Sequence, residues 1–262
     1  MSNPDPFAGG DGLPRLDGIS TPWNVVRQAH AEGSPEATQA RVALVLRYHD
    51  AVRRYVAAML PDRHDAEEVA QDTVVRLLEG RFAAAAPDRG RFRDLLKVSV
   101  RNLVIAHLER RRRDAGLPLD GHDPAAEAPD PPDVWEAECR AVLLRQAWTE
   151  LETLEFNRPG NPLHTVLRLR ADHFGENSAS LAERISAACG RAVTVANARQ
   201  LLRRARLAFA EALVRQVAAG LALPTADAVA QELADLGLIE HVRDVLPEDR
   251  FRAALHPQRG RK

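Results

Sequence analysis

Apolar residues recur at helical spacing along most of this chain, and this periodicity restricts the fold more than any other feature of the sequence. One such stripe consists of Val42, Val45, Leu46, Val52, Tyr55, Val56 and Met59. A second stripe consists of Leu96, Val100, Leu103, Val104, His107 and Leu108. Side chains at this spacing share one face of an α-helix, and that face packs against other helices. Because strand-like alternation is nearly absent, the pattern predicts an all-α fold.

The composition allows a hydrophobic core but restricts what it is made of. Hydrophobic residues make up 45% of the 262 positions and aromatic residues only 5%, so Leu, Val, Ile and Ala must form most of the core. A chain of this length can form two small domains with connecting segments. No apolar run reaches the length of a membrane span, and the first 20 residues lack the basic and apolar parts of a signal peptide. We therefore expect a cytoplasmic protein with no membrane contact.

Capping residues and helix breakers predict where the helices begin and end. We expect N-caps at Thr21, Asp65, Ser180 and Thr194, with capping boxes completed by Glu68 and Glu183. The expected helices are 21–30, a long helix ended by Pro61, 65–79, 92–113, 134–156, 162–172, 180–188, 195–217 and 225–245.

An acidic, proline-rich segment divides the chain. Between Asp114 and Glu138 there are eight acidic residues and no Arg or Lys, together with five prolines. Such a composition is typical of a solvated linker. The sequence therefore predicts a disordered arm over 1–20, a helical domain over 21–113, an acidic linker over 114–133, a second helical domain over 134–217, and a helical extension with a basic tail over 218–262.

Positive charge is concentrated on the helix expected at 92–113. Residues 89–113 contain nine basic and two acidic residues, although the net charge of the whole chain is only −1. The face that the apolar stripe leaves free is expected to carry Arg91, Arg93, Lys97 and Arg101. An unbroken run, Arg110–Arg113, ends the helix, where cations also suit the negative end of the helix dipole. Four consecutive arginines exceed what a helix end requires, and we interpret the run as a nucleic-acid contact.

The segment from Ser180 to Val217 has the plan of a helix-turn-helix, whose second helix enters the major groove of DNA. Gly190 marks the turn, and Thr194 starts the second helix. The polar side of that helix carries Asn197, Arg199, Gln200, Arg203 and Arg204. Arg and Asn or Gln can bind guanine and adenine edges. A plain helical hairpin with a solvated face is the alternative, but the net positive charge of the polar side favours DNA.

These motifs resemble those of the extracytoplasmic-function (ECF) sigma factors of bacterial RNA polymerase. Domain two of that family is similar to the segment Asp65-Ala-Glu-Glu-Val-Ala-Gln-Asp-Thr-Val-Val-Arg-Leu-Leu, followed by Phe92–Leu108 and the arginine run. Domain four is similar, more loosely, to Leu181–Glu183 and Val193–Arg206. The resemblance covers about 21–217. The N-terminal Thr-Pro-Trp helix and the extension after Val217 are similar to those of a subgroup found in planctomycete-like bacteria.

The resemblance implies a non-enzymatic subunit that directs core RNA polymerase to promoters and helps to open them. The β′ clamp helices of the polymerase would bind Asp65, Glu68, Gln71, Asp72 and Arg76. The downstream (−10) promoter element would bind Lys97, Arg101, Asn102, Arg110, Arg111, Arg112 and Arg113, and the loop at 114–117 would capture an unstacked base. The upstream (−35) element would bind Asn197, Arg199, Gln200, Arg203 and Arg204. The implied partners are core RNA polymerase, at its β′ clamp helices and β flap, promoter DNA and, as a candidate, an anti-sigma regulator.

Three positions depart from the family pattern. Ala106 stands where an Asp is usual, which removes one promoter contact, and Leu95 stands where Trp is common, which alters packing. The stretch between Glu183 and Thr194 is longer than usual, and this length affects the docking angle of the second helix.

Two other functions fit part of the sequence. A stand-alone helix-turn-helix regulator would need a dimer interface and no polymerase docking, and a helical scaffold would use the charged faces only for solubility. An enzyme is not expected, because the chain has no Gly-rich nucleophile turn and no phosphate-binding loop. Cys139 and Cys189 lack zinc-site spacing, and the histidines are irregularly placed. We therefore expect no catalytic residue, no metal and no cofactor.

Overall fold

The computed structural model describes residues 22–29, 35–82, 91–116, 130–221 and 223–255, and its regular elements there are all helices. They are α1 (Pro22–Ala29), α2 (Pro35–Met59), α3 (Arg63–Leu78), α4 (Phe92–Asp114), α6 (Pro132–Asn157), α7 (Leu163–Asp172), α8 (Ser178–Cys189), α9 (Val195–Ala219), α10 (Ala226–Asp235), α11 (Glu240–Arg243) and α12 (Glu248–Leu255). The predicted all-α class is confirmed. Among the described helices, none has the length and apolar character needed to cross a lipid bilayer.

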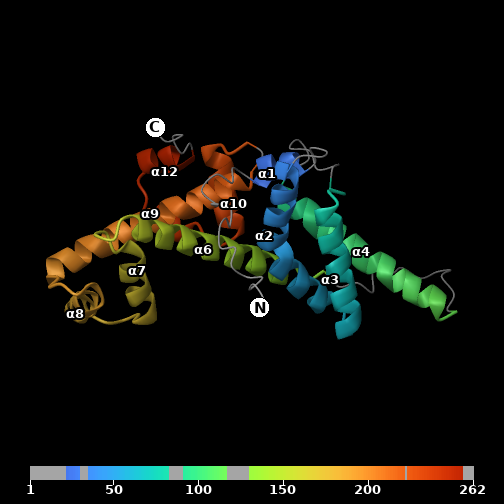
Figure 1. The fold of residues 1–262 in the computed structure, drawn as a ribbon, viewed down its shortest axis with the longest axis horizontal. Helices are drawn as coiled ribbons and strands as arrows, with labels where there is room; N and C mark the ends of the chain where they lie inside the picture. The colour runs from blue at the N-terminus through green and yellow to red at the C-terminus, as the bar shows by residue number, and fades with distance from the viewer. Residues whose placement is uncertain (1–21, 30–34, 83–90, 117–129, 222, 256–262) are drawn as a thin grey trace, which may run out of the picture.

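The helices form an elongated molecule (Figure 1). Helices α6 and α9 run along its middle, α7 and α8 lie at one end, and the end of α4 lies at the other (Figure 1). The expected arm at 1–20, the Thr21 cap, most of the acidic linker and the last residues of the basic tail lie outside the described residues.

Two hydrophobic cores stabilise the described helices. The larger core extends from Val25 on α1 to Leu255 on α12 and includes side chains from α2, α3, α4, α6, α9 and α10. The smaller core joins α7, α8 and the start of α9 and consists of Val166, Leu181, Ala182, Ile185, Ala198 and Leu201. The larger core therefore continues across the acidic segment expected to separate two domains.

Helix α6 makes this continuity possible, because its two halves pack on different partners. Near its start, the Trp135 ring meets the Tyr55 ring of α2 with centroids 5.2 Å apart. Further along, the Trp148 ring lies 5.1 Å from the Phe209 ring of α9. A single helix of 26 residues thus connects α2 with the helices of the C-terminal half.

Two predicted helix starts are wrong by about one turn. Helix α3 begins at Arg63, and its N-cap is Asp62, whose side chain accepts hydrogen bonds from the backbone N–H groups of His64 and Asp65. These backbone N–H groups, that of Asp65 first, hold the pKa of Asp62 below its usual value. Helix α8 is capped by Asn177 rather than Ser180. Each segment offers more than one capping residue, and the earliest one caps the helix. The predicted Thr194 cap of α9 is confirmed by its hydrogen bond from Asn197 N.

The C-terminal extension also differs from its prediction. The helix expected over 225–245 is interrupted, because Gly237 adopts a left-handed backbone with φ of +64°. The chain then forms the short helix α11 and, where a basic tail was expected, α12. A second correction concerns α2, where Val42 and Leu46 of the predicted stripe are exposed. In the N-terminal half of α2, the buried face consists instead of Ala37, Ala40, Leu44 and Tyr48.

Candidate nucleic-acid and polymerase interface

The arginine run forms the exposed last turns of α4. Arg110, Arg111 and Arg113 are exposed, and Arg112 is half-buried. Two of the four lean towards α3, where Arg110 lies 3.6 Å from Glu68 and Arg111 pairs with Asp65. The Arg110 and Arg111 side chains nevertheless remain 58% exposed, so this end of the molecule is accessible to an anionic partner.

Helix α3 packs beside α4 and carries the residues expected to bind polymerase. Glu68 and Gln71 are exposed, while Asp72 and Arg76 form an i,i+4 ion pair of 3.1 Å on the same helix. Asp65 is different, because only 13% of its side chain is accessible and it faces His107 of α4 at 3.3 Å. Asp65 therefore holds α3 and α4 together, and the outward face consists of the other four residues.

A groove of about 310 Å³ separates the outer faces of α3 and α4. Its walls carry Glu68, Val69, Asp72, Arg76, Leu103, Ala106, His107 and Arg110. Residues expected to bind polymerase and one expected to bind DNA thus line the same depression. Ala106, where the family usually has Asp, is part of its wall, so the departure leaves this groove without a carboxylate on that side.

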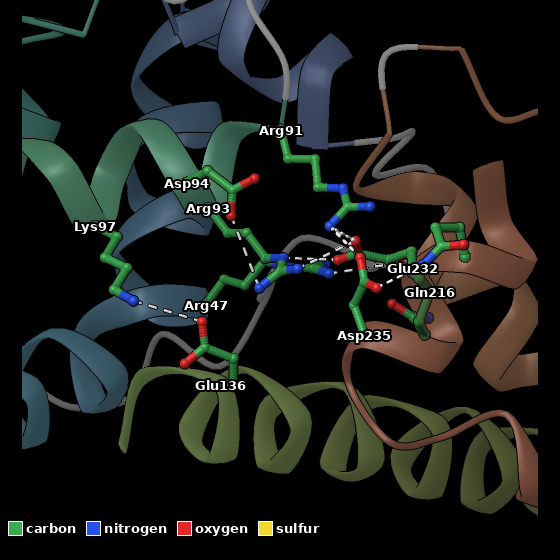
Figure 2. A network of polar contacts seen from close by, with 10 residues as sticks. Arg47, Arg91, Arg93, Asp94, Lys97, Glu136, Gln216, Glu232 and Asp235 are labelled. Carbon is green, nitrogen blue, oxygen red and sulfur yellow. Dashed lines mark hydrogen bonds and ion pairs between the residues drawn. The ribbon is translucent and has the colours of Figure 1, made fainter. Parts of the chain in front are cut away.

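The first half of α4 is covered, which corrects the expectation that its basic face is free. Lys97 has only 18% of its side chain exposed and lies 3.5 Å from both Asp130 and Glu136. Arg91 and Arg93 pair with Glu232 and Asp235 of α10 (Figure 2). Further along α4, Arg101 is half-buried and Asn102 is exposed. The described residues therefore present α4 as a helix with a covered start and an accessible end.

The covering carboxylates were not recognised from the sequence. Glu232 and Asp235 lie far from α4 along the chain, on the helix expected over 225–245. Their spacing of three residues puts both carboxylates on one face of the helix. This spacing is the sequence signal that could have indicated a shared cationic partner. Burial opposes ionisation of Asp235, but hydrogen bonds from Gln231 and Arg91 outweigh it, so the pKa of Asp235 lies below its usual value.

Helices α8 and α9 form a compact helix-turn-helix over the smaller core. Helix α8 continues to Cys189, so much of the extra length between Glu183 and Thr194 is helical. Gly190 ends α8 with φ of +63°, and its N–H donates to the Ser186 carbonyl. The Ser186 hydroxyl then accepts a 2.9 Å hydrogen bond from the backbone N–H of Val193, which fixes the turn.

The outer face of α9 presents the residues expected to read the upstream element. Asn197, Arg199, Gln200, Arg203 and Arg204 are all exposed. Arg199 also donates a 3.2 Å hydrogen bond from Nε to the Ser178 hydroxyl at the start of α8. At the same end of α8, hydrogen bonds from Arg184 hold the pKa of Glu176 below its usual value. The hydrogen bond to Ser178 holds the Arg199 side chain in place. This face of α9 lies far from the arginine run of α4 along the molecule (Figure 1).

Comparison with known families assigns one part of this arrangement. Residues 44–114 match the family model described as Sigma-70 region 2. The match begins within α2 and includes α3 and all of α4. It supports a sigma factor of the sigma-70 family, a class of DNA-binding proteins that act with RNA polymerase in transcription initiation. No curated protein and no solved structure matches the chain. Helices α6–α12 lie outside the region 2 match.

Proposed function

We propose that this protein is a sigma factor of the extracytoplasmic-function group that binds core RNA polymerase and directs promoter recognition and opening. The observation that carries the proposal is the region 2 match over α2–α4. Within that match, an outward acidic face on α3 adjoins the exposed arginine run of α4. In this proposal residues 21–113 act as domain two, 134–217 as domain four, and 218–262 as an extension like that of the planctomycete-like subgroup. The protein would act in the cytoplasm.

Each face has a role in this proposal. Glu68, Gln71, Asp72 and Arg76 would dock on the β′ clamp helices, with Asp65 holding α3 in place against α4. Asn102 and Arg110–Arg113 would contact the downstream element. The exposed face of α9 would read the upstream element, and the helices around it would meet the β flap. Arg–phosphate contacts would offset the few kcal/mol that unstacking a captured base costs.

Retention on core RNA polymerase tests the proposal. The full chain should be retained by immobilised core enzyme, and Gln71→Arg should weaken retention, because it places a cation in the middle of the acidic docking face. Gln39→Arg is a matched control, since Gln39 is also an exposed helical glutamine but lies on α2 outside that face. If the chain is not retained by core enzyme but still binds promoter DNA, a stand-alone helix-turn-helix regulator is the better assignment.

A further inference from the structure

Three cations share one stripe of α4. Arg93, Lys97 and Arg101 follow each other at intervals of four residues, and such residues lie one above the other on a helix. Arg91 precedes this stripe at the N-cap of α4. A basic stripe of this kind suits the phosphates of a nucleic-acid backbone. In the structure, however, carboxylates of the same chain occupy its first half.

Helix α10 supplies two of these carboxylates. Glu232 accepts two hydrogen bonds from Arg93, 2.7 Å from Nε and 3.2 Å from Nη2, and its other contact is with Arg91 Nη1 at 2.7 Å. Asp235 lies 2.7 Å from the same Arg91 nitrogen (Figure 2). The Arg93 and Glu232 side chains are only 11% and 7% exposed. The Arg93–Glu232 pair is therefore largely removed from water, where charge pairing is screened less than at the surface. The Arg91 and Asp235 side chains are more accessible, with 27% and 35% exposed.

The segment that leads into α6 and the first turns of α6 supply the other two. Asp130 and Glu136 each lie 3.5 Å from the Lys97 ammonium group. Asp130 also accepts a 2.7 Å hydrogen bond from the Tyr55 hydroxyl, which fixes its position against α2. Together, Asp130, Glu136, Glu232 and Asp235 form what we call the acidic cover of α4.

A carboxylate and a phosphate compete for the same guanidinium groups. Arginine presents a planar fork of N–H donors that fits either anion through paired hydrogen bonds. Helix α10 keeps its apolar side on the core, where Val229 and Leu233 are fully buried, and reaches α4 through the long polar side chains. DNA can therefore engage Arg91 and Arg93 only by replacing Glu232 and Asp235 as their partners.

We propose that the acidic cover is an autoinhibitory contact, in which Glu232 and Asp235 occupy phosphate-binding arginines of α4 and keep the affinity of the free protein for DNA low. The inference rests on the proposed function in one respect, namely that α4 faces DNA. The phosphate backbone of a DNA duplex is the partner that replaces the acidic cover. The gain in DNA affinity when the cover is removed is therefore independent of base sequence.

The test measures binding of the full chain to a fluorescently labelled DNA duplex of random sequence, across a salt series without polymerase. Glu232→Gln with Asp235→Asn should bind severalfold more tightly than the unsubstituted chain. The slope of log affinity against log salt should steepen by about 0.9 for each additional phosphate that the protein neutralises. The matched control is Glu248→Gln with Asp249→Asn, which removes two exposed negative charges from the first turn of α12. It should leave affinity and slope nearly unchanged.

A second set of variants keeps the test independent of folding. Asp235 is less buried than Glu232, so Asp235→Asn alone is expected to fold and to show a smaller increase in affinity of the same kind. Adding Arg91→Gln to it should abolish that increase, because Arg91 is the cation released. If Asp235→Asn and the double variant both fold and bind DNA like the unsubstituted chain, the autoinhibitory contact is overturned. An increase that survives Arg91→Gln, or one equalled by the α12 control, overturns it as well.

Measurements on the same protein samples distinguish a failure of this inference from a failure of the proposed function. Retention on core polymerase and promoter-dependent transcription are measured for the unsubstituted chain. If both occur while the cover variants change nothing, only the autoinhibitory contact fails. If neither occurs and no variant binds DNA, both proposals fail.

Discussion

The indole ring of Trp135 meets the ring of Tyr55 edge-on, with the two centroids 5.2 Å apart, and both side chains are fully buried. Tyr55 belongs to α2, inside the region 2 match, whereas Trp135 belongs to α6, outside it. The contact therefore places region 2 and the C-terminal helices in one hydrophobic core. It also explains why the acidic segment between them does not divide the core.

Replacing Trp135 with Ala should lower the free energy of unfolding by about 3–5 kcal/mol, because a large cavity would open between α2 and α6. Urea unfolding followed by circular dichroism measures this change. Phe156→Ala is the control, since that side chain is 83% exposed on the same helix, and its effect should stay within about 0.5 kcal/mol. Equal effects of the two substitutions would show that Trp135 is not part of a shared core.

The extent of α4 could be predicted from the sequence, but the start of α3 could not. The stripe of Leu96, Val100, Val104 and His107 is strongly periodic, and all four side chains are buried as predicted. The start of α3 depends on a choice between two nearby aspartates, Asp62 and Asp65, which have the same capping chemistry. Tertiary contacts decide between them, because Asp65 is engaged by His107 and Arg111 of α4.

The residues of the candidate site could be predicted from the sequence, but which of them are accessible to a partner could not. The cations of α4 were recognisable, but their exposure depends on partners that follow much later in the chain. Arg93 and Glu232 are separated by 139 residues, and helical periodicity carries no information about contacts over such distances. The outer face of α9 was easier to predict, because its exposure follows from the buried positions Ala198 and Ala205 on the same helix.

Replacing Arg110–Arg113 with Ala should weaken binding to DNA of every sequence, because these guanidinium groups would contact phosphates. The salt dependence should flatten by about 0.9 in slope for each phosphate that the variant no longer neutralises. Fluorescence anisotropy across a salt series measures both quantities. A control with Arg243→Ala and Arg252→Ala removes exposed arginines from α11 and α12. An unchanged slope for the α4 variant would mean that the run only terminates the helix.

Replacing Arg199 or Arg203 with Ala should change which promoters are used, because base-edge contacts discriminate at about 1–3 kcal/mol each. In vitro transcription from promoters that differ only in the upstream element measures the preference. Arg206→Ala, on the same helix but outside the expected reading set, serves as the control, and its side chain is also exposed. Equal losses on all promoters would indicate contacts with the backbone instead. Ser178→Ala removes the hydrogen bond between Arg199 and Ser178 but keeps the Arg199 side chain, so it measures the effect of that hydrogen bond alone on promoter preference.

Cys139 should resist alkylation while the protein is folded. Its side chain is buried beside a cavity of about 30 Å³ that is also lined by Arg93 and Glu232. Burial raises the pKa of the Cys139 thiol from 9.0 to about 12. At about pH 8 roughly one molecule in 10,000 would therefore carry the reactive thiolate.

The raised pKa also fixes the direction of the pH dependence. The folded state holds the Cys139 proton more tightly than the unfolded state, so this contribution to stability is complete below pH 9.0 and is lost as the pH rises through about 12. In a Cys189→Ser chain, iodoacetamide labelling followed by mass spectrometry should detect no adduct until urea unfolds the protein. A Cys139→Ser chain is the control, because the half-exposed Cys189 should then react without denaturant. Labelling of folded Cys139 at the rate seen in urea would contradict a tightly packed junction between α4, α6 and α10.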